Sequence, residues 1–135
     1  MSRQKITSER GQTMVEFALV APMLCLLLFA IIQFGILYSS WVTITDATRA
    51  GARKAAVSRR DPAPARLAET AVRNSAPNLE QTCAGTKGLC VSVTASAWEQ
   101  GEDVTVEATY PYKIDLFGIV LKEGRLKSTT TERLE

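Results

Sequence analysis

The longest uninterrupted hydrophobic pattern in the chain lies near its beginning. Residues 17–38, F-A-L-V-A-P-M-L-C-L-L-L-F-A-I-I-Q-F-G-I-L-Y, are 22 residues without a charged side chain. As a helix they would be about 33 Å long at about 1.5 Å per residue, which is enough to cross a hydrocarbon core of about 30 Å. A cleaved secretory signal has a shorter apolar region of about 7–15 residues. We therefore expect a transmembrane helix, with Tyr38 and Trp41 in the position of an interfacial aromatic belt.

The residues before this helix are polar and basic. In M-S-R-Q-K-I-T-S-E-R-G, residues 1–11, only Ile6 is apolar, and we interpret this segment as a cytoplasmic leader. Five basic residues also follow the helix within about 22 residues, so a count of charges does not decide the orientation. We place the N-terminus in the cytoplasm because the leader charges lie closer to the membrane and because Cys83 and Cys90 suit an oxidising compartment.

A helical pattern continues beyond the membrane segment to about residue 60. Charged residues recur at helical spacing on one face, namely Asp46, Arg49, Arg53 and Arg60. The opposite stripe consists mostly of small side chains, namely Ile44, Ala47, Gly51 and Ala55. Small residues let another backbone approach closely. The stripe packs either on the chain's own globular part or on a neighbouring subunit, and the pattern does not decide between them.

The remaining residues predict a small α+β domain. Asp61 as N-cap and Pro62 as first helical residue can start a short amphipathic helix that continues over residues 64–76. Apolar residues then alternate over residues 91–97 and 104–110, which predicts a hairpin with one buried face. A Thr-rich run, residues 126–132, can add a third strand at an edge. The expected fold is a long N-terminal transmembrane helix that continues into a small extracytoplasmic domain with one short helix and a three-stranded antiparallel sheet.

An apolar run and the cysteines complete this picture. We interpret L-F-G-I-V-L, residues 116–121, as core, with a loop facing the membrane or a partner as the alternative. Cys25 lies in the transmembrane run and is expected to pack as a small apolar side chain. Two glycines lie between Cys83 and Cys90, so a short disulfide is sterically easy and would contribute about 2–3 kcal/mol; two unpaired thiols are the alternative.

Charge and composition exclude several functions. The formal net charge is +2, and the leader alone supplies this excess, so the rest of the chain offers no basic surface for nucleic acid. The chain has no histidine, which removes the commonest general base and most zinc and copper sites. We therefore expect no cofactor, no metal and no catalytic residues.

The segment R-G-Q-T-M-V-E-F-A-L-V-A-P, residues 10–22, resembles the N-terminus of prepilins of the type IV class. In those proteins a leader peptidase cuts after a glycine, and the fifth residue of the product is glutamate. By this resemblance Gly11 ends the leader, Gln12 becomes the first mature residue, and Glu16 is fifth, followed by Phe17 where Flp pilins usually have tyrosine. From the residues alone, Glu16 could instead be the last solvated residue before the membrane.

The wider resemblance is to the TadE-like pseudopilins of the tight-adherence (Tad) pilus system. It rests on the N-terminal motif, on T-R-A-G-A-R at residues 48–53, and on V-T-V-E-A-T-Y-P-Y at residues 104–112. The resemblance implies a minor pilin or pseudopilin that takes part in assembly of a Tad-type (Flp) adhesion pilus, without enzymatic activity. It divides the chain into a leader (1–11), a transmembrane and continuing helix (12–60) and an outer domain (61–135).

The resemblance also implies partners and residue roles. The partners would be other pilin and pseudopilin subunits, the prepilin peptidase, the pilus assembly platform and the bacterial inner membrane. Glu16, followed by Phe17, would set the register between subunits by neutralising the new amine of a neighbour's Gln12.

Two other functions stay open. The chain could be an uncleaved, signal-anchored binding module of the periplasm, for which Gly11 and Glu16 would be incidental. A small membrane-anchored enzyme is disfavoured by the lack of histidine and of a clustered acidic motif. N-terminal sequencing separates the pilin from the binding module, because only a prepilin loses residues 1–11.

Overall fold

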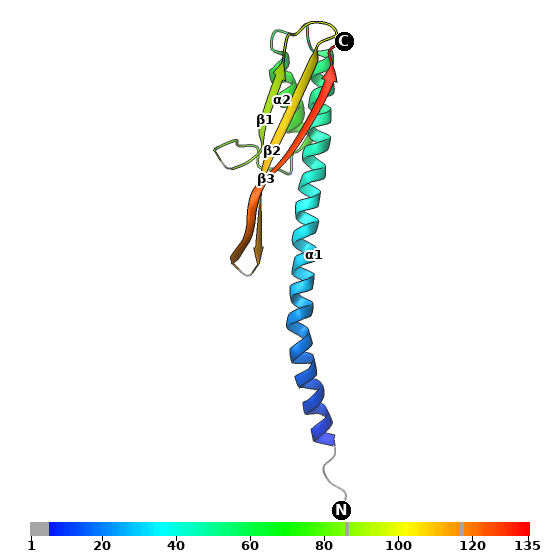
Figure 1. Ribbon diagram of the computed structural model, residues 1–135, viewed down its shortest axis with the longest axis vertical. Helices are drawn as coiled ribbons and strands as arrows, with labels where there is room; N and C mark the ends of the chain where they lie inside the picture. Colours follow the sequence, from blue (N-terminus) through cyan, green and yellow to red (C-terminus); the bar gives the residue numbers. More distant parts are fainter. Residues whose placement is uncertain (1–5, 86, 117) are drawn as a thin grey trace, which may run out of the picture. The chain divides into compact units, whose positions relative to one another are not determined.

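The computed structural model describes residues 6–85, 87–116 and 118–135. These residues form two helices, α1 (Ile6–Val57) and α2 (Pro64–Ser75), and three strands, β1 (Cys90–Ala95), β2 (Asp103–Leu116) and β3 (Ile119–Arg133) (Figure 1). The chain divides into two units, residues 1–35 and 36–135, and α1 continues from the first into the second. The α+β fold expected from the sequence is confirmed. Residues 1–5 of the expected leader lie outside the described residues.

Helix α1 is 52 residues long and contains Pro22 in its interior. A proline there removes one backbone hydrogen bond, which transmembrane helices tolerate better than soluble ones. Beyond the apolar run, three hydroxyl groups donate to carbonyl oxygens one turn back. The bonds are Ser40 Oγ to Ile36 O at 3.0 Å, Thr43 Oγ1 to Ser39 O at 2.9 Å, and Thr45 Oγ1 to Trp41 O at 2.8 Å. These polar side chains therefore stay compatible with the helix.

The three strands form an antiparallel sheet in the order β1-β2-β3. Strand β1 pairs with β2 from Cys90↔Thr109 to Ala95↔Val104, whereas β2 and β3 stay paired as far as Leu116↔Ile119. Strand β2 thus continues through Pro111, where the sequence pattern indicated an interruption. Proline is tolerated there because β1 has already ended, so β2 has a paired neighbour on one side only.

The core of the second unit lies between the sheet and the two helices. The inward side chains of β2 are Val104, Val106 and Ala108, all fully buried. They pack with residues from α1 and α2 in two clusters that include Ile44, Ala47, Ala55, Ala68 and Val72. The small-residue stripe of α1 therefore packs on the chain's own domain, which resolves the choice that the sequence left open.

One buried polar group joins α1 to β3. Thr48 is fully buried, and its hydroxyl donates to Thr45 O at 2.8 Å. Because that bond uses its single proton, Thr48 accepts from Ser128 and Thr130, whose hydroxyls both lie 3.1 Å away. The hydroxyl is therefore fully hydrogen-bonded, which removes the cost of burying it.

The expected start of the second helix was wrong. Asp61 and Pro62 lie outside α2, whose N-cap is Ala63, without a side-chain hydrogen bond, and whose first residue is Pro64. The reason is steric, because a residue that precedes proline is disfavoured in the helical region. Ala63 has φ −145° and ψ 65°, so a helix cannot run from Pro62 through it.

The interpretation of residues 116–121 as core was also wrong. This run contains the end of β2 and the start of β3, so its described residues lie at the tip of a long hairpin (Figure 1). The side chains of Ile119, Val120 and Leu121 are exposed by 67%, 44% and 62%. The Leu116 side chain and Phe117 lie outside the described residues.

Candidate functional site

The four residues of the leader and registry motif lie within the first third of α1. Gly11, Gln12, Glu16 and Phe17 are all exposed, and a β-carbon on Gly11 would meet no atom within 4 Å. Gln12 and Glu16 are one helical turn apart, and Gln12 Nε2 donates to Glu16 Oε1 at 3.2 Å. The glutamate thus has one neutral partner on its own helix. Gly11 lies within α1, so a cut after it would remove the first turns of this helix.

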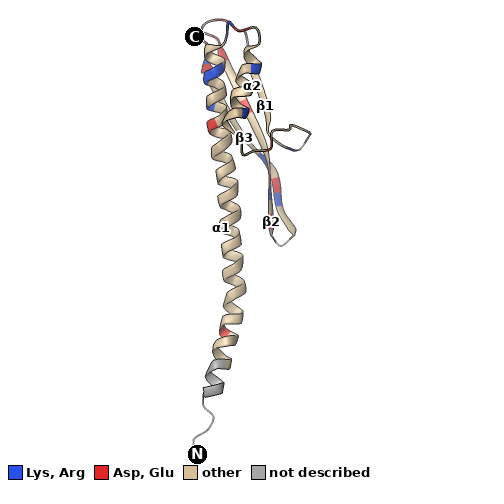
Figure 2. Ribbon diagram, turned by 180° about the vertical axis from the view of Figure 1, so that it is seen from behind, with Lys and Arg blue, Asp and Glu red and all other residues tan. Residues whose placement is uncertain are grey.

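The surface that follows this motif is apolar and uncovered. Within the described residues, one helical segment, Gly11–Val57, is long and apolar enough to cross a membrane, and its most apolar 18-residue window has no buried share. No charged residue stands between Glu16 and Asp46 in the sequence, and this stretch of α1 is uniformly tan in Figure 2. A single-pass membrane anchor is compatible with this surface.

The end of the apolar stretch carries two aromatic side chains. The ring centroids of Tyr38 and Trp41 are 6.0 Å apart in a tilted arrangement, and both side chains are substantially exposed. Amphipathic rings of this kind prefer the level of the lipid headgroups. Further along α1, Asp46 and Arg49 form an exposed ion pair at 3.6 Å. Tyr38 and Trp41 thus lie together at the end of the apolar stretch, and their place at a membrane boundary stays a prediction.

Cys83 and Cys90 form a disulfide in the structure, with their Cα atoms 4.9 Å apart. Residues Gly85 and Gly88 within the loop both have positive φ, 59° and 72°. At Gly88 a β-carbon would lie 1.9 Å from the carbonyl oxygen of Thr82, so no other residue fits there. Among the described cysteines, Cys25 is free and exposed on the apolar stretch of α1.

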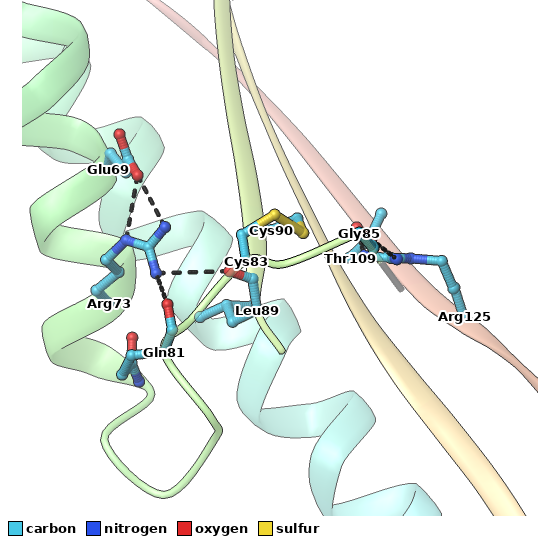
Figure 3. The surroundings of a disulfide bond; sticks show 9 residues. All are labelled: Glu69, Arg73, Gln81, Cys83, Gly85, Leu89, Cys90, Thr109 and Arg125. Atoms are coloured by element: carbon cyan, nitrogen blue, oxygen red, sulfur yellow. Dashed lines mark hydrogen bonds and ion pairs between the residues drawn. A yellow bond between two sulfur atoms is a disulfide. The ribbon is translucent and has the colours of Figure 1, made fainter. Parts of the chain in front are cut away.

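Arg73 of α2 connects the helix to both sides of the disulfide loop (Figure 3). Its guanidinium pairs with Glu69 one turn earlier, with Nη2 2.9 Å and Nε 3.1 Å from Oε1. Its Nη1 also donates to the backbone carbonyl of Gln81, just before the loop, and to that of Leu89, the loop residue next to Cys90, the latter at 3.5 Å. The helical spacing predicted the pair with Glu69, but no sequence signal indicated the two carbonyl contacts, because they depend on how the loop folds back.

A second arginine, Arg125, connects the disulfide loop to the sheet. Arg125 of β3 donates to Gly85 O at 3.1 Å and to Thr109 Oγ1 of β2 at 2.9 Å (Figure 3). Between this loop and the hairpin lies an open pocket of about 600 Å³, lined by groups that include Glu80, Tyr112 and Arg125. Within the described residues, no group of three or more His, Cys, Asp or Glu side chains could hold a metal ion. The disulfide loop is thus held in place by hydrogen bonds from two arginine side chains, Arg73 and Arg125.

Comparison with known proteins adds one finding. Residues 11–53 match the family model of TadE-like proteins, so the resemblance read from the sequence is confirmed over the helix that carries the motif. No curated protein and no solved structure matches the chain. The family match begins at Gly11 and ends at Arg53, within α1.

Proposed function

We propose that this chain, whose residues 11–53 match the TadE-like family, is a minor pilin or pseudopilin that takes part in assembly of a Tad-type (Flp) adhesion pilus. The observation that carries the proposal is the position of the match. It begins at Gly11, the glycine after which the prepilin pattern places the cut, and it continues along an apolar helix whose surface is uncovered.

The proposed subunit begins as a prepilin in the bacterial inner membrane. Residues 1–11 form the leader on the cytoplasmic side, residues 12–60 the transmembrane and continuing helix, and residues 61–135 the domain outside. Prepilin peptidase cuts between Gly11 and Gln12. The mature subunit then joins other pilin and pseudopilin subunits at the pilus assembly platform.

The fold supports this sequence of events. The second half of α1 has its own partners in α2 and the sheet, where Ile44, Ala47 and Ala52 are fully buried. The apolar first half has no such cover. Its lipid neighbours can therefore be exchanged for the helices of other subunits without unfolding the domain.

Glu16 is proposed as the group that sets the register between subunits, with Phe17 beside it. Its only described hydrogen-bond partner is the neutral amide of Gln12, so a carboxylate remains available on the exposed helix surface. After the cut, Gln12 of each subunit carries a new amine. A carboxylate and an amine brought together in an apolar bundle stabilise one alignment and penalise all others.

The cut after Gly11 is the experiment that tests the proposal. Intact mass and N-terminal sequencing of protein from cells with the cognate peptidase are expected to show Gln12 as the first residue. The same protein from cells without the peptidase serves as the control and should begin at the leader. An uncut chain in peptidase-competent cells would refute the pilin assignment and favour the signal-anchored binding module.

A further inference from the structure

The tip of the β2–β3 hairpin presents apolar side chains on both of its faces. Ile119, Val120 and Leu121, which we call the hairpin tip, are consecutive and exposed. Ile119 and Val120 pair with Leu116 and Asp115 as successive strand residues, so their side chains point to opposite faces, whereas Leu121 lies at a register shift between the two strands. A strand that docks on one protein surface needs only one apolar face. Two apolar faces indicate a tip that is surrounded by an apolar medium.

The contacts between β3 and α1 show where this tip points. Ser128 and Thr130 contact Thr48, and the amide of Glu135 donates to Ala56 O at 3.2 Å. Strand β3 and the second half of α1 therefore run in the same direction. The hairpin tip lies at the end of the 36–135 unit opposite the C-terminus, which is the end where α1 enters it (Figure 1).

The lengths of the two elements place the tip near the level of Tyr38. From Ser128 back to Val120 the strand covers about 26 Å at about 3.3 Å per residue, and it runs roughly along α1 (Figure 1). From Thr48 back to Tyr38 the helix covers about 15 Å at about 1.5 Å per residue. The tip thus reaches at least as far as the aromatic pair at the end of the apolar stretch of α1, where an interfacial belt is expected.

The polar groups near the tip suit a headgroup environment. The one acidic group next to the turn, Asp115, accepts a hydrogen bond from the amide of Gly118 at 2.9 Å and pairs with Lys113 at 3.3 Å. Its charge is therefore partly balanced. Lys122 directly follows the tip, and its long aliphatic stem lets the ammonium reach lipid phosphates while the neighbouring residues lie deeper.

We propose that, in the membrane-resident subunit, the hairpin tip inserts into the lipid interface on the domain's side of the membrane and forms a second membrane contact beside α1. This contact goes beyond the proposed pilin function and rests only on membrane insertion of α1. It holds the domain in one orientation above the bilayer, which a single helix alone does not do.

The test measures the depth of a spin label at the tip. The full chain carries Cys25→Ala, so that a thiol introduced by Val120→Cys is the only one free for labelling, and is reconstituted into vesicles of phosphatidylethanolamine and phosphatidylglycerol. The matched control is Glu99→Cys, an exposed turn residue between β1 and β2, at the other end of the sheet. Oxygen partitions into lipid, whereas a charged nickel chelate stays in water.

The label at residue 120 is expected to collide with oxygen in preference to the nickel chelate, with a ratio several-fold higher than at residue 99. Equal, water-like ratios at both positions would overturn the proposal. So would a label at residue 120 that is shielded from both reagents, because that result indicates a protein neighbour such as a second copy. A label introduced by Ile119→Cys repeats the measurement on the other face. No pilus component is present, so the outcome is independent of the pilin assignment.

Discussion

Gly51 of α1 lies directly against Val72 of α2, and a β-carbon on Gly51 would stand 2.3 Å from Cγ2 of Val72. The same β-carbon would be 3.2 Å from the backbone oxygen of Ala68, so a shift of the valine side chain alone would not relieve both close contacts. We predict that Gly51→Ala destabilises the domain. Overpacking costs about 1–3 kcal/mol, and alanine regains up to about 1 kcal/mol in helix propensity. Chemical unfolding in detergent, followed by circular dichroism, should give a net loss of about 1–2 kcal/mol.

Two variants make this prediction specific. Gly35→Ala is the matched control, because a β-carbon there meets nothing within 4 Å, and it should not destabilise the chain. In the double variant Gly51→Ala, Val72→Ala the clash with the valine side chain is relieved, so its loss should be smaller than the sum of the two single losses. Strict additivity would show that the two residues do not press on each other.

The disulfide predicts how many cysteine thiols react with an alkylating reagent before and after reduction. Of the three cysteines, Cys83 and Cys90 are joined and Cys25 is free. Alkylation of the denatured protein should add one label before reduction and three after it. The double variant Cys83→Ser, Cys90→Ser should lose about 2–3 kcal/mol, since the closed loop restricts the unfolded chain. Three labels without reductant would contradict both the disulfide and the placement of the domain in an oxidising compartment.

Arg73 is predicted to stabilise the loop mainly through its carbonyl contacts. Arg73→Ala removes the bonds to Gln81 O and Leu89 O together with the ion pair, and should cost about 1–3 kcal/mol. Glu69→Gln is the comparison, because it removes only the charge of the partly exposed pair and should cost less than about 1 kcal/mol. Thermal unfolding of both variants gives the ranking. Equal losses would mean that the ion pair, rather than the carbonyl contacts, holds the loop.

The sequence predicted helices and strands correctly where hydrophobic residues follow a regular pattern over many positions. The alternation of Val104, Val106 and Ala108 correctly indicated a half-buried strand, and the uncharged run over residues 17–38 correctly indicated a long apolar helix. The start of α2 was predicted wrongly, although the spacing of the two prolines in the sequence was enough to predict it correctly. D-P-A-P offers two prolines for the first helical position, but only the second leaves Ala63 free to be non-helical.

The hairpin tip could not be recognised from its composition. An apolar run bounded by turn signals looks the same in a buried strand and at an exposed end, because the pattern records hydrophobicity and not burial. For the candidate site, the i,i+4 spacing made the contact between Gln12 and Glu16 predictable. The carbonyl contacts of Arg73 were not, since they bring together segments that local patterns treat separately.

The last prediction concerns Glu16, whose charge can be removed without losing its described hydrogen bond to Gln12. In Glu16→Gln the side chain keeps an oxygen that can accept from Gln12 Nε2, so the described contact on the helix survives and only the charge is lost. Removing a charge also makes the helix easier to insert, and the glycine at the cut is untouched. The variant should therefore be made, inserted and processed as the original chain is.

Association with other subunits should fail, however. If Glu16 pairs with the amine of a neighbour's Gln12, the substitution leaves that amine unpaired in an apolar bundle, and breaking such a buried pair costs about 3–5 kcal/mol. Crosslinking or co-purification with pilin partners, scaled to the amount of subunit in the membrane, measures the effect. Asp46→Asn is the control, because it removes the charge of an exposed carboxylate on the same helix outside the registry motif and should retain association. Unchanged association of Glu16→Gln would mean that Glu16 only marks the edge of the membrane, since an amide is no harder to solvate there than a carboxylate.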